Sequence, residues 1–367
     1  MEEDSVESFE DRLKGAESTS GGNPLLVQLV QTLNSAVVYS DAGNFETNKK
    51  LWNEYAKSWR AEQPWVQRMQ QQTASGSSQE TAADDEHHDL SVPLLGSEWS
   101  DTKSLDEIVS NWLLPLFSRE QHGGKTSGLT VGEIGVGGAR VASKLLRRVP
   151  KNRGAVREEN GLAAIDTLVA FDISSEMLKK AKQALRDLAR VRTGPPFPET
   201  SAAAAAAEDD AAMPSVDLHL LDSPDLPPSY TERFDVMYSV DVFPHLDLHV
   251  TFTYLTHIRR SLKPGGLCFL SFADLTSPGG WSRFARQKKY SVGGFYFMCR
   301  EMVTTLVGRA GLQVVRINER ADEAHTRGTS ATTEAAECAT AGRYEFAGGK
   351  NVYLMRDILV VVKRPCE

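Results

Sequence analysis

The sequence predicts an α/β fold in which helices cover both faces of a mostly parallel sheet. From residue 129 onward, short apolar segments typical of buried strands alternate with longer segments of helical periodicity, which is the pattern of a doubly wound sheet. The first strand also runs into a glycine-rich turn that opens a helix, LTVGEIGVGGAR. Such a turn lets a ligand approach the backbone and presents the free N–H groups of the helix start.

Seven strands are expected in this region. The first four occupy residues 129–134, 166–171, 216–221 and 234–239, with helices at 139–148 and 174–190 and a third helix that ends at the LKPGG run. The proline and glycines of that run suit a sharp turn into a fifth strand at 267–272. The last two strands are expected at 312–319 and 356–363.

Composition divides the chain into three parts. Residues 1–47 are a polar tail in which a short helix could lie at 23–38, residues 48–118 are a helical cap with a flexible linker at 70–90, and residues 119–367 are the core. Three polar or alanine-rich stretches, 147–163, 192–214 and 321–342, are interpreted as inserts in that core.

Two helices are predicted in the cap. In the first, Trp52, Tyr55 and Trp59 recur at helical spacing and form an aromatic face. In the second, Ser104 or Asp106 is the expected N-cap, and the helix is expected to stop near Pro115.

Composition also disfavours several classes of function and of binding site. A formal net charge of -8 disfavours a general nucleic-acid surface, which needs a basic stripe. The 4 cysteines have no C-x-x-C spacing, so neither a metal site nor a disulfide framework is expected. The sequence has no secretory signal and no apolar segment of membrane-spanning length, so a cytoplasmic protein is expected. Nothing in the sequence indicates its oligomeric state.

The sequence of the glycine-rich turn distinguishes between two classes of nucleotide-binding site. A dinucleotide fold requires G-x-G-x-x-G, and Arg140 stands where its third glycine belongs. The run from Glu133 to Gly138 instead resembles motif I of the class I S-adenosylmethionine-dependent methyltransferases, (D/E)xGxGxG, with Ala139 in place of the last glycine. SLKPGGLCFLSF and the segments 95–99 and 281–312 are also similar to parts of small-molecule methyltransferases in this superfamily.

The resemblance implies a Rossmann-like three-layer sandwich with a seven-stranded sheet whose last strand is antiparallel. It implies S-adenosylmethionine as cofactor and in-line methyl transfer to an oxygen, nitrogen or carbon atom of a small organic molecule. The residues that we expect to contact the cofactor are Glu133, Gly135, Val136, Gly137, Gly138, Asp172, Ile173, Met177, Leu221, Asp222 and Ser239.

Asp172 is the residue on which this expectation depends most. It ends the second strand, where a carboxylate suits the ribose diol, although the same residue could cap the following helix. It lies 39 residues after Glu133, against about 20 in ordinary units, and the insert at 147–163 is taken to account for the excess. Met177 could form an adenine floor or simply pack in the core.

The methyl acceptor is less clearly indicated. His245, after the fourth strand, could act as a general base or could be a structural histidine. Aromatic side chains could form the acceptor's walls, although core packing explains each of them singly. The residues expected to form these walls are Tyr55, Trp59, Trp99 and Tyr296.

Other functions stay open at this stage. The chain could be a non-catalytic relative that serves as an interaction platform in a larger assembly. It could also methylate a protein or RNA, of which the acidic balance disfavours RNA. A nicotinamide-dependent oxidoreductase is disfavoured by Arg140 in the glycine turn.

Overall fold

The computed structural model describes residues 44–60, 94–97, 99–150, 161–193, 214–287, 294–319 and 351–366. All of them belong to the compact unit Asn44–Glu367. The expected tail helix at 23–38, the linker at 70–90, and most of the three inserts lie outside the described residues.

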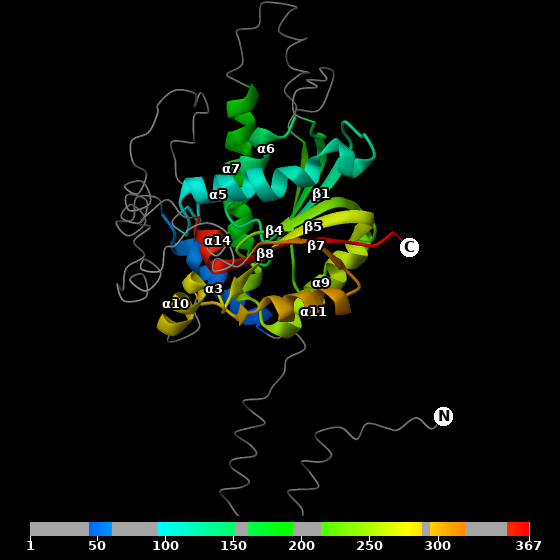
Figure 1. Ribbon diagram of the computed structural model, residues 1–367. Helices are drawn as coiled ribbons and strands as arrows, with labels where there is room; N and C mark the ends of the chain where they lie inside the picture. Colours follow the sequence, from blue (N-terminus) through cyan, green and yellow to red (C-terminus); the bar gives the residue numbers. More distant parts are fainter. Residues whose placement is uncertain are drawn as a thin grey trace, which may run out of the picture. The chain divides into compact units, whose positions relative to one another are not determined.

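A single sheet forms the middle layer of this unit (Figure 1). Its strands are β1 (Leu129–Ile134), β2 (Ile165–Asp172), β3 (Ser215–Leu220), β4 (Phe234–Ser239), β5 (Leu262–Asp274), β7 (Gln313–Ile317) and β8 (Asp357–Lys363), in the spatial order β3-β2-β1-β4-β5-β8-β7. The strands from β3 to β5 pair in parallel, and β8 pairs antiparallel with both β5 and β7. The predicted mostly parallel sheet with an antiparallel last strand is therefore confirmed.

The structure adds one short strand to the seven that were predicted. Strand β6 contains only Phe297 and Met298 and pairs in parallel with the end of β5. Two residues are too few to show a strand periodicity, so no sequence pattern indicates this strand.

Helices cover the two faces of the sheet. On one face lie α5 (Thr102–Ile108), α6 (Arg140–Arg148) and α7 (Ser175–Thr193), and on the other lie α9 (Leu248–Ser261) and α11 (Arg300–Arg309) (Figure 1). The strand side chains that pack against α5, α6 and α7 alternate along each strand, as Val131 and Leu129 do in β1. Both faces of the central strands are buried, which explains why these strands are apolar almost throughout.

Three further helices stand at the carboxyl edge of the sheet. Helix α3 (Phe45–Ser58) packs along α7, and α10 (Pro278–Arg286) packs against α14 (Val352–Arg356), which leads directly into β8. None of the described helices is long and apolar enough to cross a membrane.

The start of α5 differs from the prediction. Asp101, not Ser104 or Asp106, caps the helix, because its carboxylate accepts a hydrogen bond of 2.7 Å from the backbone N–H of Ser104. Asp106 instead pairs with Lys144 and Arg148 of α6.

The end of α5 is also irregular, with a π-turn (Val109–Leu113) followed by a 3₁₀ turn (Leu114–Phe117). Pro115 explains this ending, because it has no N–H and its ring crowds the preceding turn.

The cap of α5 gives a direct stability test. Replacing the carboxylate in Asp101→Ala is expected to lower the free energy of unfolding by about 1 kcal/mol, since one backbone donor at the helix start loses its acceptor. Asp101→Asn keeps an acceptor at the same position and is expected to retain most of that stability. Urea denaturation of the two variants checks this, and an unchanged free energy of unfolding in Asp101→Ala would show that the side-chain cap contributes nothing.

Candidate functional site

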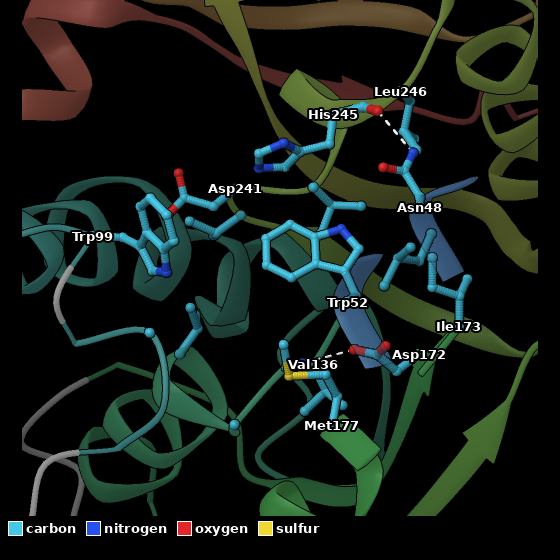
Figure 2. Close-up of a pocket in the computed structure, with 18 of the residues that line it drawn as sticks. Asn48, Trp52, Trp99, Val136, Asp172, Ile173, Met177, Asp241, His245 and Leu246 are labelled. Atoms are coloured by element: carbon cyan, nitrogen blue, oxygen red, sulfur yellow. Dashed lines mark hydrogen bonds between the residues drawn. The ribbon is translucent and has the colours of Figure 1, made fainter. Parts of the chain in front are cut away.

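A pocket opens at the carboxyl edge of the sheet, where the turns after β1, β2, β3 and β4 meet. Helix α3 together with Leu95, Gly96 and Trp99 forms its opposite wall. Figure 2 shows the Trp52 indole in the middle of this pocket, with Asp172 and Met177 on one side of it and His245 and Asp241 on the other. The residues that line it are Phe45, Asn48, Trp52, Tyr55, Leu95, Gly96, Trp99, Ile134, Gly135, Val136, Gly137, Gly138, Arg140, Val141, Asp172, Ile173, Met177, Leu221, Val240, Asp241, Val242, His245, Leu246, Tyr254, Phe295 and Arg356.

Bare backbone forms the floor of the pocket at the glycine turn. Gly135 has a φ of +74°, and a Cβ at that position would lie 2.1 Å from Cγ2 of Val242. A Cβ on Gly138 would lie 2.8 Å from the carbonyl oxygen of Leu95. Both positions therefore require glycine, the first because of its backbone angle and both because of the space available.

Ala139, which departs from the motif's last glycine, has a left-handed conformation with a φ of +62°. Its backbone N–H donates to the carbonyl of Val136, and its side chain is fully buried at the start of α6. Ala139 thus adopts the left-handed backbone conformation that a glycine would usually have at this position.

Asp172 joins the second strand to the glycine turn. One carboxylate oxygen accepts from the backbone N–H of Gly137 at 2.9 Å, and the other accepts from that of Ser174 at 2.8 Å. Burial raises the pKa of Asp172 to about 6, although these two backbone hydrogen bonds lower it. Asp172 therefore binds the backbone at the start of the helix after β2 and also lines the pocket, so the two roles considered for it from the sequence are compatible.

Glu133 and Ser239 lie behind the turn and do not line the pocket. The Tyr238 hydroxyl donates to the Glu133 carboxyl at 3.0 Å, and burial raises the pKa of Glu133 well above its usual value in spite of that hydrogen bond. The Ser239 hydroxyl donates to the carbonyl of Ile134 at 2.9 Å. Both side chains support the end of β1 from within the core.

Ile173, Met177 and Leu221 line one end of the pocket, as expected for an adenine site. Asp222 does not line it. The Asp222 carboxylate is exposed and receives an ion pair of 2.9 Å from Lys49 of α3, which connects that helix to the turn after β3.

The expected acceptor residues divide into two groups. Tyr55 and Trp99 line the pocket and touch each other, because the Trp99 indole N–H donates to the Tyr55 hydroxyl at 2.9 Å. Trp59 packs in a small cluster with Leu95 and does not line the pocket. Tyr296 also lies outside the lining residues. Trp52, which the aromatic helix face included, lines the pocket together with Tyr55.

His245 is buried in the pocket wall between two aromatic rings. Its ring lies 5.0 Å from that of Trp52 and 5.2 Å from that of Phe295, centroid to centroid. Nδ1 lies 2.8 Å from the carbonyl oxygen of Gly294. Burial lowers the pKa of His245 to about 4, although this hydrogen bond raises it. A carbonyl can only accept, so the neutral ring carries its proton on Nδ1 and a lone pair on Nε2.

Sequence reasoning missed a buried charge cluster beside His245. The Asp241 carboxylate accepts from Arg140 at 3.1 Å, from the Tyr353 hydroxyl at 2.8 Å and from Arg356 at 2.9 Å. Burial raises the pKa of Asp241, but Arg356 and Arg140 more than offset this and hold the pKa below its usual value. Asp241 also has a φ of +59°, a rare angle for a residue other than glycine.

Two residues of this cluster could have been noticed from the sequence. Arg140 stood out as the residue that breaks the dinucleotide motif, and Asp241 follows the fourth strand directly. Tyr353 and Arg356 belong to the five-residue helix α14, which is too short to be recognised from periodicity. Among the described residues, no three His, Cys, Asp or Glu side chains are placed to hold a metal ion.

Comparison with known proteins identifies part of the core. Residues 196–270 match the family model of a methyltransferase domain. A search of curated protein sequences finds no match.

Several solved structures are similar at low identity. Magnesium protoporphyrin IX methyltransferase of Synechocystis PCC 6803 is 14% identical, with 71% of this chain and 82% of that chain covered and a TM-score of 0.40. The [4+2]-cyclase SpnF is 12% identical, with 87% and 97% covered and a TM-score of 0.45. A sarcosine dimethylglycine methyltransferase of Galdieria sulphuraria, described as putative, is 11% identical, with 71% and 85% covered and a TM-score of 0.39. At these TM-scores, nothing about the chemistry of this chain follows from the likeness.

The domain match agrees with the sheet order and with the glycine turn that faces the pocket. Residues 196–270 therefore belong to a methyltransferase domain, and S-adenosylmethionine is the cofactor of this enzyme.

Proposed function

We propose that this enzyme transfers the methyl group of S-adenosylmethionine to a small organic molecule bound in the same pocket. The observation that carries the proposal is the continuity of the pocket, which runs from the glycine turn and Asp172 to His245 and Phe295 along one aromatic wall. A cofactor at the first end and an acceptor at the second would meet inside one partly enclosed space.

The residues at the first end fit S-adenosylmethionine. The cradle at Gly135 and Gly138 lines the pocket with bare backbone, because a Cβ there would meet Val242 and Leu95, and this backbone can lie directly against a ligand. The Asp172 carboxylate has two oxygens at the pocket wall and can accept from both hydroxyls of a ribose. Ile173, Met177 and Leu221 supply apolar surface for the adenine ring. Bound there, the cofactor supplies an activated methyl group on its sulfonium.

The second end suits an organic acceptor. Trp52, Tyr55 and Trp99 give apolar walls with polar tips, and His245 offers the Nε2 lone pair as a hydrogen-bond acceptor or weak base. The sequence is compatible with a general base or a structural histidine at His245, and the position of a neutral imidazole in the pocket wall supports the base. The overall charge of -8 supports a small molecule over a nucleic acid as the acceptor.

The cradle can be tested with S-adenosylhomocysteine, the demethylated cofactor. Gly135→Ala is expected to weaken its binding more than about tenfold, because the new Cβ would push against Val242 and the backbone angle disfavours alanine. Adding Val242→Ala removes the nearest methyl group and is expected to restore part of the affinity. Isothermal titration measures both variants, and unchanged affinity in Gly135→Ala would contradict the cradle.

Asp172 should make cofactor binding depend on pH. With a pKa of about 6, its carboxyl is ionised above pH 6 and protonated below it. Only the carboxylate can accept from both ribose hydroxyls, so affinity for S-adenosylhomocysteine is expected to be constant above pH 7 and about tenfold weaker at pH 5. Titration calorimetry across that range measures the effect.

The raised pKa of Asp172 makes the fold more stable at low pH, whereas it weakens cofactor binding there. Loss of binding at low pH can therefore be distinguished from acid unfolding. The folded pKa of Asp172 lies above its unfolded value, so its protonation stabilises the fold as the pH falls from about 6 to about 4. Acid unfolding through this residue therefore cannot cause weaker binding. Asp172→Asn should bind weakly with a flat pH profile, and an unaltered acid dependence in that variant would assign the titration to another group.

The protonation state of His245 is a separate prediction. Carbon-13 NMR of labelled histidine should show the Nδ1–H tautomer of a neutral ring from pH 8 down to pH 5, with titration only near pH 4. His245→Gln identifies the signal among the 8 histidines. An Nε2–H tautomer, or titration near the ordinary value of about 6.5, would remove the proposed base.

A further inference from the structure

Arg356 has one guanidinium nitrogen that the charge cluster does not use. Nε and Nη2 donate to the two carboxylate oxygens of Asp357 at 2.7 and 2.6 Å, and Nη2 also donates to Asp241 at 2.9 Å. Within the part of the chain that the structure describes, Nη1 has no hydrogen-bond acceptor. The residue is only 9% exposed, yet it lines the pocket. A buried guanidinium with an unused donor edge is suited to an anionic group of a ligand.

The surroundings of Arg356 favour a flat anion. The guanidinium carbons of Arg356 and Arg283 lie 5.0 and 4.9 Å from the centroid of the Phe295 ring, and that ring borders His245. Aromatic surface and positive charge therefore occur together at this end of the pocket. Asp241, the carboxylate that lines this end of the pocket, already accepts from three donors, and a cationic ligand there would face the guanidiniums of Arg140 and Arg356, which also line it.

We propose that the methyl acceptor is an aromatic organic acid whose carboxylate is bound by Nη1 of Arg356. This inference rests on the proposed function and names the chemical class of its acceptor. The carboxylate and the ring have separate binding surfaces in the wall, because Arg356 provides the donor and Phe295, Trp52 and Trp99 provide apolar faces. Two anchor points would fix the orientation of the acceptor toward the methyl group.

The cofactor also carries a carboxylate, and the structure favours the acceptor as the source. The residues proposed for the cofactor lie on the turns after β1, β2 and β3. Arg356 ends α14, immediately before β8, and packs against Phe295, which precedes β6. The acceptor end is formed by these later elements.

The experiment measures ligand binding to the protein saturated with S-adenosylhomocysteine. Saturation-transfer NMR compares benzoate with benzamide and phenylacetate with phenylacetamide, pairs that differ in charge at nearly constant shape. The carboxylates are expected to bind about tenfold more tightly than their amides, the effect of one charge-assisted hydrogen bond. Arg356→Gln and Arg356→Lys are each expected to abolish that preference.

The lysine variant tests whether a lost preference reflects ligand recognition or misfolding of the protein. It keeps a positive charge beside Asp357 and Asp241, which a glutamine would leave uncompensated in the interior, but it lacks the second donor edge. Arg286→Gln, an exposed arginine of α10 outside the pocket, is the matched control and should leave the preference intact.

Three results would overturn the proposal. One is an equal affinity of carboxylates and amides for the wild-type protein, and another is a preference that survives in both Arg356 variants. The third is a loss of S-adenosylhomocysteine affinity in the Arg356 variants while 5′-methylthioadenosine, which lacks the amino-acid portion, still binds normally. That pattern would assign Nη1 to the cofactor's own carboxylate. Failure of the wild-type protein to bind S-adenosylhomocysteine would instead refute the cofactor site of the proposed function.

Discussion

The pocket depends on how closely the turn after β1 approaches the turn after β4. With no space for a Cβ on Gly135 beside Val242, the two turns are in direct contact, and the floor between them is backbone. Gly138 makes a similar approach to Leu95, which brings the segment before α5 against the same turn. Asp172 then holds the turn from a third side through the N–H of Gly137. Three separate parts of the chain thus meet at the three glycines of the turn, whose backbone forms the floor of the pocket.

The charge cluster on the other side of the pocket couples distant parts of the chain. Arg140 begins α6, Asp241 follows β4, and Arg356 ends α14, yet their charged groups meet in hydrogen bonds of 2.9 to 3.1 Å. Burying such pairs costs desolvation energy, so they add little net stability in general. Their effect here is geometric, because three donors fix the Asp241 carboxylate and hold its backbone in a rare left-handed conformation. The arginine that breaks the dinucleotide motif therefore has a structural partner in this fold.

Much of the sheet could be predicted from the sequence, and parts of the site could not. Strands β1 and β4 have the predicted bounds because each is an apolar run that ends at a glycine or polar turn. The cap at Asp101 was missed because three polar residues compete within one turn, and only the fold decides which carboxylate meets the N–H of Ser104. The sequence pattern also could not show that Glu133 and Trp59 lie behind the residues that line the pocket. Arg356 could not be placed because its partner in the charge cluster, Asp241, is 115 residues away in the sequence.

The wall opposite the glycine turn has a different origin from the floor. Helix α3 is attached to the edge of the sheet mainly through side chains that end at the turns. Asn48 donates to the carbonyl of His245, Asn53 accepts from the hydroxyl of Ser174, and Lys49 pairs with Asp222. Each tether reaches a different turn, so the position of Trp52 and Tyr55 depends on the turns after β2, β3 and β4 together. An exposed pair such as Lys49 with Asp222 contributes about 0 to 1 kcal/mol, whereas the Asn48 hydrogen bond is buried, and Ala56 of the same helix and Trp59 at its end pack in a buried cluster with Met177. The floor is fixed by close backbone contact and suits a constant methyl donor. The wall is fixed by replaceable side chains, and under the proposed function α3, α14 and the segment around Phe295 select the acceptor.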